Sequence, residues 1–277
     1  MKHSARILFL AAAFASALSC GRAKPVARVS VSPNPIVLAY PQCATIDFDW
    51  RPLRPLDRLR GKPLVFVHLL DGPHHLVRTA DHALPAEWKP NVPMKYAITM
   101  CQSALAPALR PGTYQLKIGL YDDQLGYRWP LETGGEETGR RGYRVAKVSV
   151  PRDAPTPAFA FAGSWLPTET VESHQILARR WFAGSASMSI ANIRGPGAIH
   201  LELHLPQGAT LASDCAVPRE RLLLPGDQTL DLRVESAPTG GRCTIQWMPA
   251  DGNAKSRGRL DVAAWLPASV VSQVGYF

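Results

Sequence analysis

The 277-residue sequence has no long hydrophobic run. Its most apolar stretch, residues 7–18, has about 12 residues, whereas a helix needs about 20 to cross the hydrocarbon core of a bilayer. Long helical periodicity is missing, and so are a phosphate loop, a dinucleotide fingerprint and a Gly-x-Ser-x-Gly elbow. An enzyme would therefore have to be assembled from residues that carry no recognised motif.

Cysteine is scarce, with five residues, and Cys20 is the most informative of them. It closes an N-terminal segment in which Lys2 and Arg6 precede the apolar stretch, a pattern typical of a signal peptide. Residues 17–20 (Ala-Leu-Ser-Cys) resemble the lipobox of bacterial lipoproteins. This resemblance implies that Cys20 is lipidated, and Gly21, which is not Asp, favours the outer membrane. The alternative is an ordinary secretory signal cleaved nearby, with Cys20 left as an unpaired thiol.

The four other cysteines fall two in each half of the chain. The pairing that crosses no boundary joins Cys43 to Cys101 and Cys215 to Cys243, and such disulfides persist outside the reducing cytosol. A metal site is the alternative, but neither Cys-x-x-Cys nor Cys-x-x-His spacing occurs. We therefore predict two disulfides, no metal and no cofactor.

The composition is basic and rich in turn-forming residues. Twenty-five Pro and 21 Gly lie scattered without a period among 46% hydrophobic residues, which indicates many turns between short strands. The formal charge is +9, and loss of Lys2 and Arg6 with the signal leaves +7. Outside the cytoplasm, such a surface suits anionic lipid, lipopolysaccharide or acidic glycan better than nucleic acid. Two groups of cations stand out, for which solvated loops are the simpler interpretation: Arg51, Arg54, Arg58, Arg60 and Lys62, and then Arg140, Arg141 and Arg144.

Hydrophobic residues alternate with polar ones in several short segments. Residues 113–121 place Tyr114, Leu116, Ile118 and Leu120 on one face, and residues 199–205 and 230–234 alternate in the same way. Residues 64–70 are almost continuously apolar, as in a central strand covered on both faces. The pattern predicts an all-β chain of two consecutive antiparallel β-sandwiches, immunoglobulin-like or jelly-roll-like.

A proline-rich segment divides the chain. Three Pro lie within residues 151–157, directly after an apolar strand pattern, and such segments space domains semi-rigidly. The predicted organisation is a signal peptide (1–19), a lipidated Cys with a proline-rich tether (20–35), a first sandwich (36–150), a linker (151–157) and a second sandwich (158–277).

Several short motifs resemble a known family of domains. They include residues 50–53 (Trp-Arg-Pro-Leu), 65–71 (Val-Phe-Val-His-Leu-Leu-Asp), 109–116 (Leu-Arg-Pro-Gly-Thr-Tyr-Gln-Leu) and 119–122 (Gly-Leu-Tyr-Asp). This part resembles the extracytoplasmic β-sandwich domains appended to bacterial membrane glycosyltransferases of the dolichyl-phosphate-mannose type. Residues 163–167 resemble, more loosely, the sandwich that follows in those proteins. The resemblance implies a fold and not a reaction, because this chain lacks the multi-span catalytic part.

Histidines and tryptophans supply the candidate site residues. His68, His74, His75 and His82 lie near Asp71 and Asp81, and converging imidazoles could bind a metal or act as acid and base. Hydrogen-bonded core histidines and exposed turns are the commoner outcome. Trp88 and Trp129 stand among Pro and polar residues, where exposed rings could stack on pyranoses, although most tryptophans fill cores. The ligand-binding candidates are Trp88, Trp129, His68 and His82.

These observations predict a non-catalytic envelope lipoprotein, anchored in the outer membrane through Cys20, that binds or organises a cell-surface glycan or glycolipid such as lipopolysaccharide. One alternative is a structural or assembly partner of an envelope protein complex. Another is a metal-dependent hydrolase built on residues 68–82. No catalytic residue is assigned.

Overall fold

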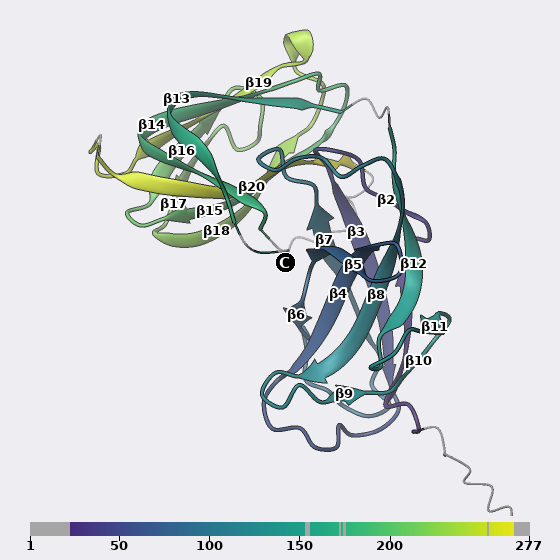
Figure 1. Cartoon of the computed structure of the whole chain (residues 1–277). Coiled ribbons are helices and arrows are strands. Elements are labelled where there is room, and N and C mark those ends of the chain that lie inside the picture. The colour runs from purple at the N-terminus through teal and green to yellow at the C-terminus, as the bar shows by residue number, and fades with distance from the viewer. Residues whose placement is uncertain (1–22, 153–155, 172, 174–175, 254, 269–277) are drawn as a thin grey trace, which may run out of the picture.

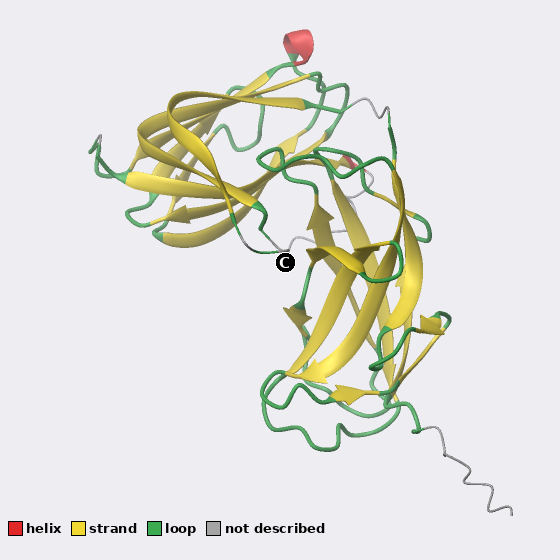
Figure 2. Cartoon of the chain, in the orientation of Figure 1, coloured by secondary structure: helices red, strands yellow, loops and turns green. Residues whose placement is uncertain are grey.

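The computed structural model describes residues 23–152, 156–171, 173, 176–253 and 255–268. Cys20, the rest of the signal segment and residues 153–155 of the linker lie outside this description. Figure 2 shows the described chain as two lobes made almost entirely of strands, and the content is 60% strand and 1% helix. The all-β prediction is therefore confirmed.

The first lobe contains two sheets that pack face to face. The first has the strand order β10 (Leu131–Thr133), β1 (Ala27–Ser32), β3 (Cys43–Pro52) and β7 (Met94–Cys101). The second has the order β11 (Glu136–Glu137), β12 (Tyr143–Val150), β8 (Gly112–Asp122), β4 (Pro63–Asp71) and β5 (His75–Thr79). Three short strands flank it: β2 (Ile36–Val37) beside β12, β6 (His82–Ala83) beside β4, and β9 (Arg128–Trp129) beside β8.

Alternation along the strands builds the core of this first sandwich. Leu116, Ile118 and Leu120 of β8 are fully buried, as the pattern in residues 113–121 predicts. They pack with Phe48 and Trp50 from β3 of the opposite sheet in one cluster. The intervening residues of β8 point away from the core, so the outer face of the second sheet is left for polar side chains.

The second lobe is one sheet folded onto itself. Its strand order is β17 (Glu220–Leu223), β16 (Ala209–Ser213), β19 (Cys243–Pro249), β14 (Ala178–Ala191), β20 (Arg257–Pro267), β15 (Gly197–Leu205) and β18 (Gly226–Val234), with β13 (Ala158–Thr170) beside β14. A short 3₁₀ helix spans Thr239–Gly241. The early part of β14 pairs with β20 and the later part with β19, so one strand belongs to both layers.

The sheet of the second lobe turns over onto itself at a bend in the β13–β14 pair. The pairing shifts register around Trp165, and Gly163 and Gly184 adopt φ values of 87° and 65°, which favour glycine. The ring of Trp165 lies 5.0 Å from that of Phe182 and 5.4 Å from that of Trp247. Bulges and bends let strands switch layers in a sandwich, and here three aromatic rings fill the corner.

The two lobes meet through backbone and core contacts (Figure 1). The Ala104 N–H donates to the carbonyl of Ala263 at 2.7 Å, and the Trp265 N–H donates to that of Pro41 at 2.8 Å. Leu105, in the loop after β7, packs in the core of the second lobe. The lobes are thus in direct contact at the end of the first sandwich where β3 begins and β7 ends.

Both predicted disulfides are present. Cys43 and Cys101 face each other across β3 and β7, and Cys215 bonds to Cys243 at the start of β19. The first of them contacts the second lobe, where it packs in one cluster with small and apolar side chains of β15 and β20. Among the described residues, no helix is long and apolar enough to span a bilayer.

Candidate functional site

The net positive charge is concentrated in one half of the chain. Residues 23–150 contain 17 Lys and Arg against 11 Asp and Glu, whereas residues 151–277 contain 11 of each. A search for an anion-binding surface therefore begins on the first sandwich. The outer face of its second sheet carries the polar side chains of β4, β8 and β12.

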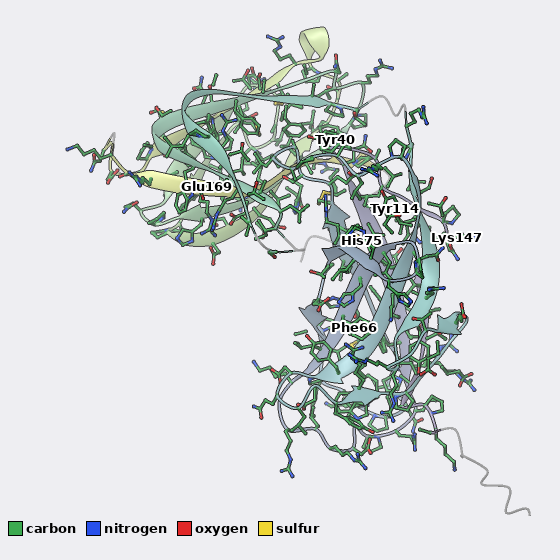
Figure 3. The ribbon with its side chains drawn as sticks, in the orientation of Figure 1. Tyr40, Phe66, His75, Tyr114, Lys147 and Glu169 are labelled. Atoms are coloured by element: carbon green, nitrogen blue, oxygen red, sulfur yellow. A yellow bond between two sulfur atoms is a disulfide. The ribbon has the colours of Figure 1, made fainter. Side chains whose placement is uncertain are left out.

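A row of basic side chains crosses this outer face. His68 of β4 is opposite Lys117 of β8, and Lys117 is opposite Arg144 of β12. The next row holds Phe66 opposite Gly119. A Cβ atom at position 119 would lie 2.3 Å from the Phe66 ring, so the glycine provides the space in which that ring lies. Figure 3 labels Phe66 in the part of this lobe distant from the second sandwich.

Arginines from three separate segments lie on aromatic rings beside this row. The guanidinium carbon of Arg128 is 4.6 Å from the centre of the Phe66 ring. Those of Arg58 and Arg141 are 5.2 Å and 5.0 Å from the centre of the Tyr127 ring. Such cation–π contacts stabilise by about 0.5–1 kcal/mol at exposed sites. We call Arg58, Lys117, Arg128, Arg141 and Arg144, with Phe66 and Tyr127, the basic surface.

The cations of the basic surface are crowded and poorly neutralised. Among the described carboxylates, only that of Glu136 lies within 4 Å of any of them, at 3.6 Å from Arg144. The Nε atom of Arg144 is buried without a hydrogen-bond partner. Burial lowers the pKa of Lys117, and the nearby charges of Arg128 and Arg144 lower it further. A bound anion would relieve this repulsion.

Backbone geometry also indicates a functional surface. Arg58, Arg140 and Arg141 have φ values of 61°, 49° and 53°, in the left-handed region that side chains rarely adopt. Residues held in such conformations cost free energy and cluster at binding sites. Arg140 and Arg141 form the turn before β12, and the Arg140 carbonyl accepts a hydrogen bond from Arg128 at 3.2 Å.

The buried carboxylate of Asp122 holds the loops beneath these arginines. It accepts hydrogen bonds from the backbone N–H groups of Arg60, Gly61, Gln124 and Leu125, at 2.6–3.0 Å. Burial alone raises its pKa, but these four donors lower it to about 2. Sequence reasoning missed this residue. A single Asp at the end of a strand does not indicate which loop its carboxylate will bind. Here that loop lies 61 positions earlier in the chain.

Neither predicted tryptophan presents a free ring. Trp129 is fully buried, and its Nε1–H donates to the carbonyl of Asp57 at 2.8 Å, so the expectation of an exposed loop ring there is wrong. Trp88 is half-buried, with its ring edge-on to Trp50 at 6.2 Å and its Nε1–H bonded to the Arg54 carbonyl. The Trp129 ring is part of the core of the first sandwich, and the Trp88 ring packs against that core.

The two candidate histidines lie in different environments. His68 faces outward, 3.5 Å from Asp81, with its ring 4.8 Å from that of Phe66, so it adjoins the basic surface. His82 is largely buried and contacts the Ala80 carbonyl at 2.9 Å and the Tyr96 hydroxyl at 2.8 Å. Burial lowers its pKa. The structure therefore does not bring the imidazoles of His68 and His82 together.

No protein-family model and no curated protein matches this chain. Among solved structures, it is similar to the β-glucosidase from Listeria innocua in complex with glucose, at 14% identity and a TM-score of 0.29, over 46% of this chain and 16% of that one. It is similar to TmCBM61 in complex with β-1,4-galactotriose, at 16% identity and a TM-score of 0.28, over 40% and 87% of the two chains. It is also similar to the CARDB domain of a Pyrococcus furiosus protein in complex with di-metal ions, at 14% identity and a TM-score of 0.28, over 47% of this chain and 96% of that one. At such scores these likenesses carry no argument about function.

Proposed function

We propose that this chain is a non-catalytic envelope lipoprotein that binds the acidic headgroup of a cell-surface glycan or glycolipid through the basic surface. The observation that carries the proposal is the set of arginines held on aromatic rings without carboxylate partners among the described residues. Arg128 and Arg141 each donate one hydrogen bond to a backbone carbonyl, and the other donors of these planar guanidinium groups suit carboxylate and phosphate groups. Neighbouring rings suit the apolar faces of sugars.

The nearness of Cys20 in the sequence to residues beside the basic surface supports a ligand at a membrane surface. Ala23 lines a hollow together with Arg54, Asp57 and Tyr127, beside the basic surface. Cys20 stands three residues before Ala23 in the sequence. With an acyl chain on Cys20, the basic surface would lie near lipid headgroups. Each Lys or Arg close to an anionic membrane contributes about 1 kcal/mol of attraction.

The test is binding of the purified mature protein to lipopolysaccharide and to acidic oligosaccharides, measured by calorimetry at several salt concentrations. Replacing both Lys117 and Arg128 with Gln should weaken binding about thirtyfold, because two contacts of about 1 kcal/mol each are lost. The double variant should also reduce the salt dependence.

Arg242→Gln is the matched control, since Arg242 is exposed in the second sandwich and its loss lowers the net charge without touching the basic surface. It should bind within twofold of the unchanged protein. Equal weakening in the control, or no binding of any acidic glycan or glycolipid by the unchanged protein, contradicts the proposal.

A second candidate, an assembly partner of an envelope complex, is favoured by the edge strand β17. Leu222 on β17 and Leu224 directly after it expose 66% and 67% of their surface. Met248 lies in the same row of the sheet as Leu222, with Thr210 of β16 between them. A photo-crosslinker at position 222 should then give one discrete protein adduct in cells, and the same group at position 242 should give none. Identical patterns from both positions would exclude this candidate.

A further inference from the structure

A small cavity lies between the two sandwiches, away from the basic surface. Its volume is about 90 Å³, which corresponds to about three water molecules. Its lining includes Arg78 and Thr99 from the first sandwich, and Glu202 and Asp261 from the second. Ser103, in the loop between β7 and β8 that packs against the second lobe, completes the polar lining.

Arg78 brings a buried charge to this cavity without a counter-charge. It lies on β5 and exposes only 8% of its surface. Its hydrogen bond is to the carbonyl of the adjacent Val77, at 2.8 Å. No carboxylate of the described residues lies within 4 Å of its guanidinium. A buried cation without an anion is costly, since the desolvation penalty is several kcal/mol per ion.

The two carboxylates on the opposite wall are already engaged. The carboxylate of Asp261 accepts hydrogen bonds from Nε and Nη2 of Arg259, at 2.7–3.0 Å. Glu202 lies 3.5 Å from the Nε2 of His200. Asp261 therefore has Arg259 as its cation, and Glu202 shares the His200 ring with Asp231, which lies 2.7 Å from it. Neither Asp261 nor Glu202 lies within 4 Å of Arg78.

Hydroxyl groups in the lining complement the guanidinium. Ser103 Oγ accepts from the N–H groups of Leu105 and Ala263, both at 3.2 Å, and no described group accepts its O–H. Thr79 and Thr99 also line the cavity. A guanidinium with neighbouring hydroxyl donors is the arrangement that recognises oxyanions.

We propose that this cavity binds a small oxyanion of the phosphate or carboxylate type, held by Arg78 of the first sandwich and the Ser103 hydroxyl. The ligand is coupled to the second lobe, because the Ser103 hydroxyl that holds it also accepts the N–H of Ala263. Occupancy then strengthens the contact between the sandwiches. This site is independent of the basic surface.

Inorganic phosphate is the probe, added to the full mature protein and followed by hydrogen exchange. The amides of Ala104 and Ala263, which form bonds between the lobes, should exchange at least fivefold more slowly at saturating phosphate. Unchanged exchange at both amides in saturating phosphate overturns the proposal. This measurement needs no variant, so it stands even where substitutions impair folding.

Variants then assign the effect to Arg78. Arg78→Gln should weaken phosphate binding at least tenfold by calorimetry, as expected when one charged hydrogen-bond partner is removed. Arg78→Lys should retain partial binding. Arg242→Gln and the Lys117→Gln/Arg128→Gln double variant should bind as the unchanged protein does. Loss of phosphate binding in the double variant, with Arg78→Gln unaffected, would place the anion on the basic surface and refute this site.

Discussion

The two sandwiches neutralise their positive charges in different ways. In the second, four cations have carboxylate partners: Arg179 with Glu169 at 3.3 Å, His200 with Asp231 at 2.7 Å, His204 with Asp227 at 2.7 Å and Arg259 with Asp261 at 2.7 Å. Arg180 lies on the rings of Phe161 and Trp165. The first sandwich has ion pairs too, such as Arg28 with Glu132 at 2.9 Å, but Arg58, Arg128 and Arg141 lie on aromatic rings without a carboxylate of the described residues within 4 Å. The second half of the chain thus balances Lys and Arg with Asp and Glu, whereas the first half has six more basic than acidic residues, among them the arginines of the basic surface.

The two sandwiches also differ in how their sheets enclose the core and in where their disulfides lie. The first sandwich has two separate sheets, and its disulfide joins neighbouring strands at the contact with the other lobe. The second is a single sheet in which β14 serves both layers, and its disulfide ties a loop to β19. The first disulfide is therefore placed to affect both lobes, and the second to affect only its own.

Removing the disulfides should give the largest effects on stability, and the two removals should affect the lobes differently. Replacing Cys43 and Cys101 with Ala should lower the free energy of unfolding by roughly 4 kcal/mol, on the chain-entropy account of a loop of this length. Because this disulfide packs against the second lobe, calorimetry should show both unfolding transitions shifted downward.

The matched change, Cys215 and Cys243 to Ala, should cost about 3–4 kcal/mol and shift one transition alone. Equal shifts of both transitions by both variants would show that the lobes unfold as one unit, contrary to the comparison.

The stability of the two sandwiches should depend on pH in opposite directions, because each contains a histidine whose pKa is shifted in the folded state. Burial alone lowers the pKa of His200, but hydrogen bonds and charges from Asp231 and Glu202 raise it to about 9. Its unfolded value is about 6.5, so the stabilisation is complete below pH 6.5 and is lost as the pH rises through 9. Urea unfolding should show a loss of about 3 kcal/mol over that window, and His200→Gln should abolish this part of the pH dependence.

His82 in the first sandwich should respond in the opposite direction. Burial lowers its pKa below the unfolded value, so the folded state favours the neutral ring. Its stabilisation is present above pH 6.5 and is lost as the pH falls through the folded value. His82→Gln should therefore reduce the acid sensitivity and leave the alkaline loss unchanged. Acid sensitivity identical to that of the unchanged protein would contradict this assignment.

The smallest expected effect on stability concerns a glycine that lies beneath a phenylalanine ring in each sandwich. A Cβ at Gly119 would lie 2.3 Å from Phe66, and one at Gly258 would lie 2.3 Å from Phe182. Substitution of either by Ala should cost about 1–3 kcal/mol by overpacking. Only Gly119→Ala should also weaken anion binding, because Phe66 supports Arg128 of the basic surface.

Phe66→Leu in the Gly119→Ala background makes room for the methyl group and is the control for this mechanism. It should recover part of the lost stability without restoring binding. Full binding by Gly119→Ala itself would show that the position of the Phe66 ring does not matter to the ligand.

Local periodicity made much of the fold predictable. The alternation in residues 113–121 and 199–205 placed β8 and β15, with Leu116 and Leu201 buried as expected. The outcome for Trp129 was not predictable in this way. Neighbouring Pro and polar residues indicate a loop, but they do not reveal that the carbonyl of Asp57, from a distant segment, accepts its N–H.

By itself, the sequence determined the all-β character, the core faces of the clearest strands and the pairing of four cysteines. These depend on a period of two residues and on simple counting, both of which are local properties. Only the tertiary structure decided that Arg58 and Arg141 meet on Tyr127, that β14 joins two layers and that Arg78 faces a cavity between the lobes. These features depend on contacts between segments far apart in the chain, and no local pattern encodes such contacts.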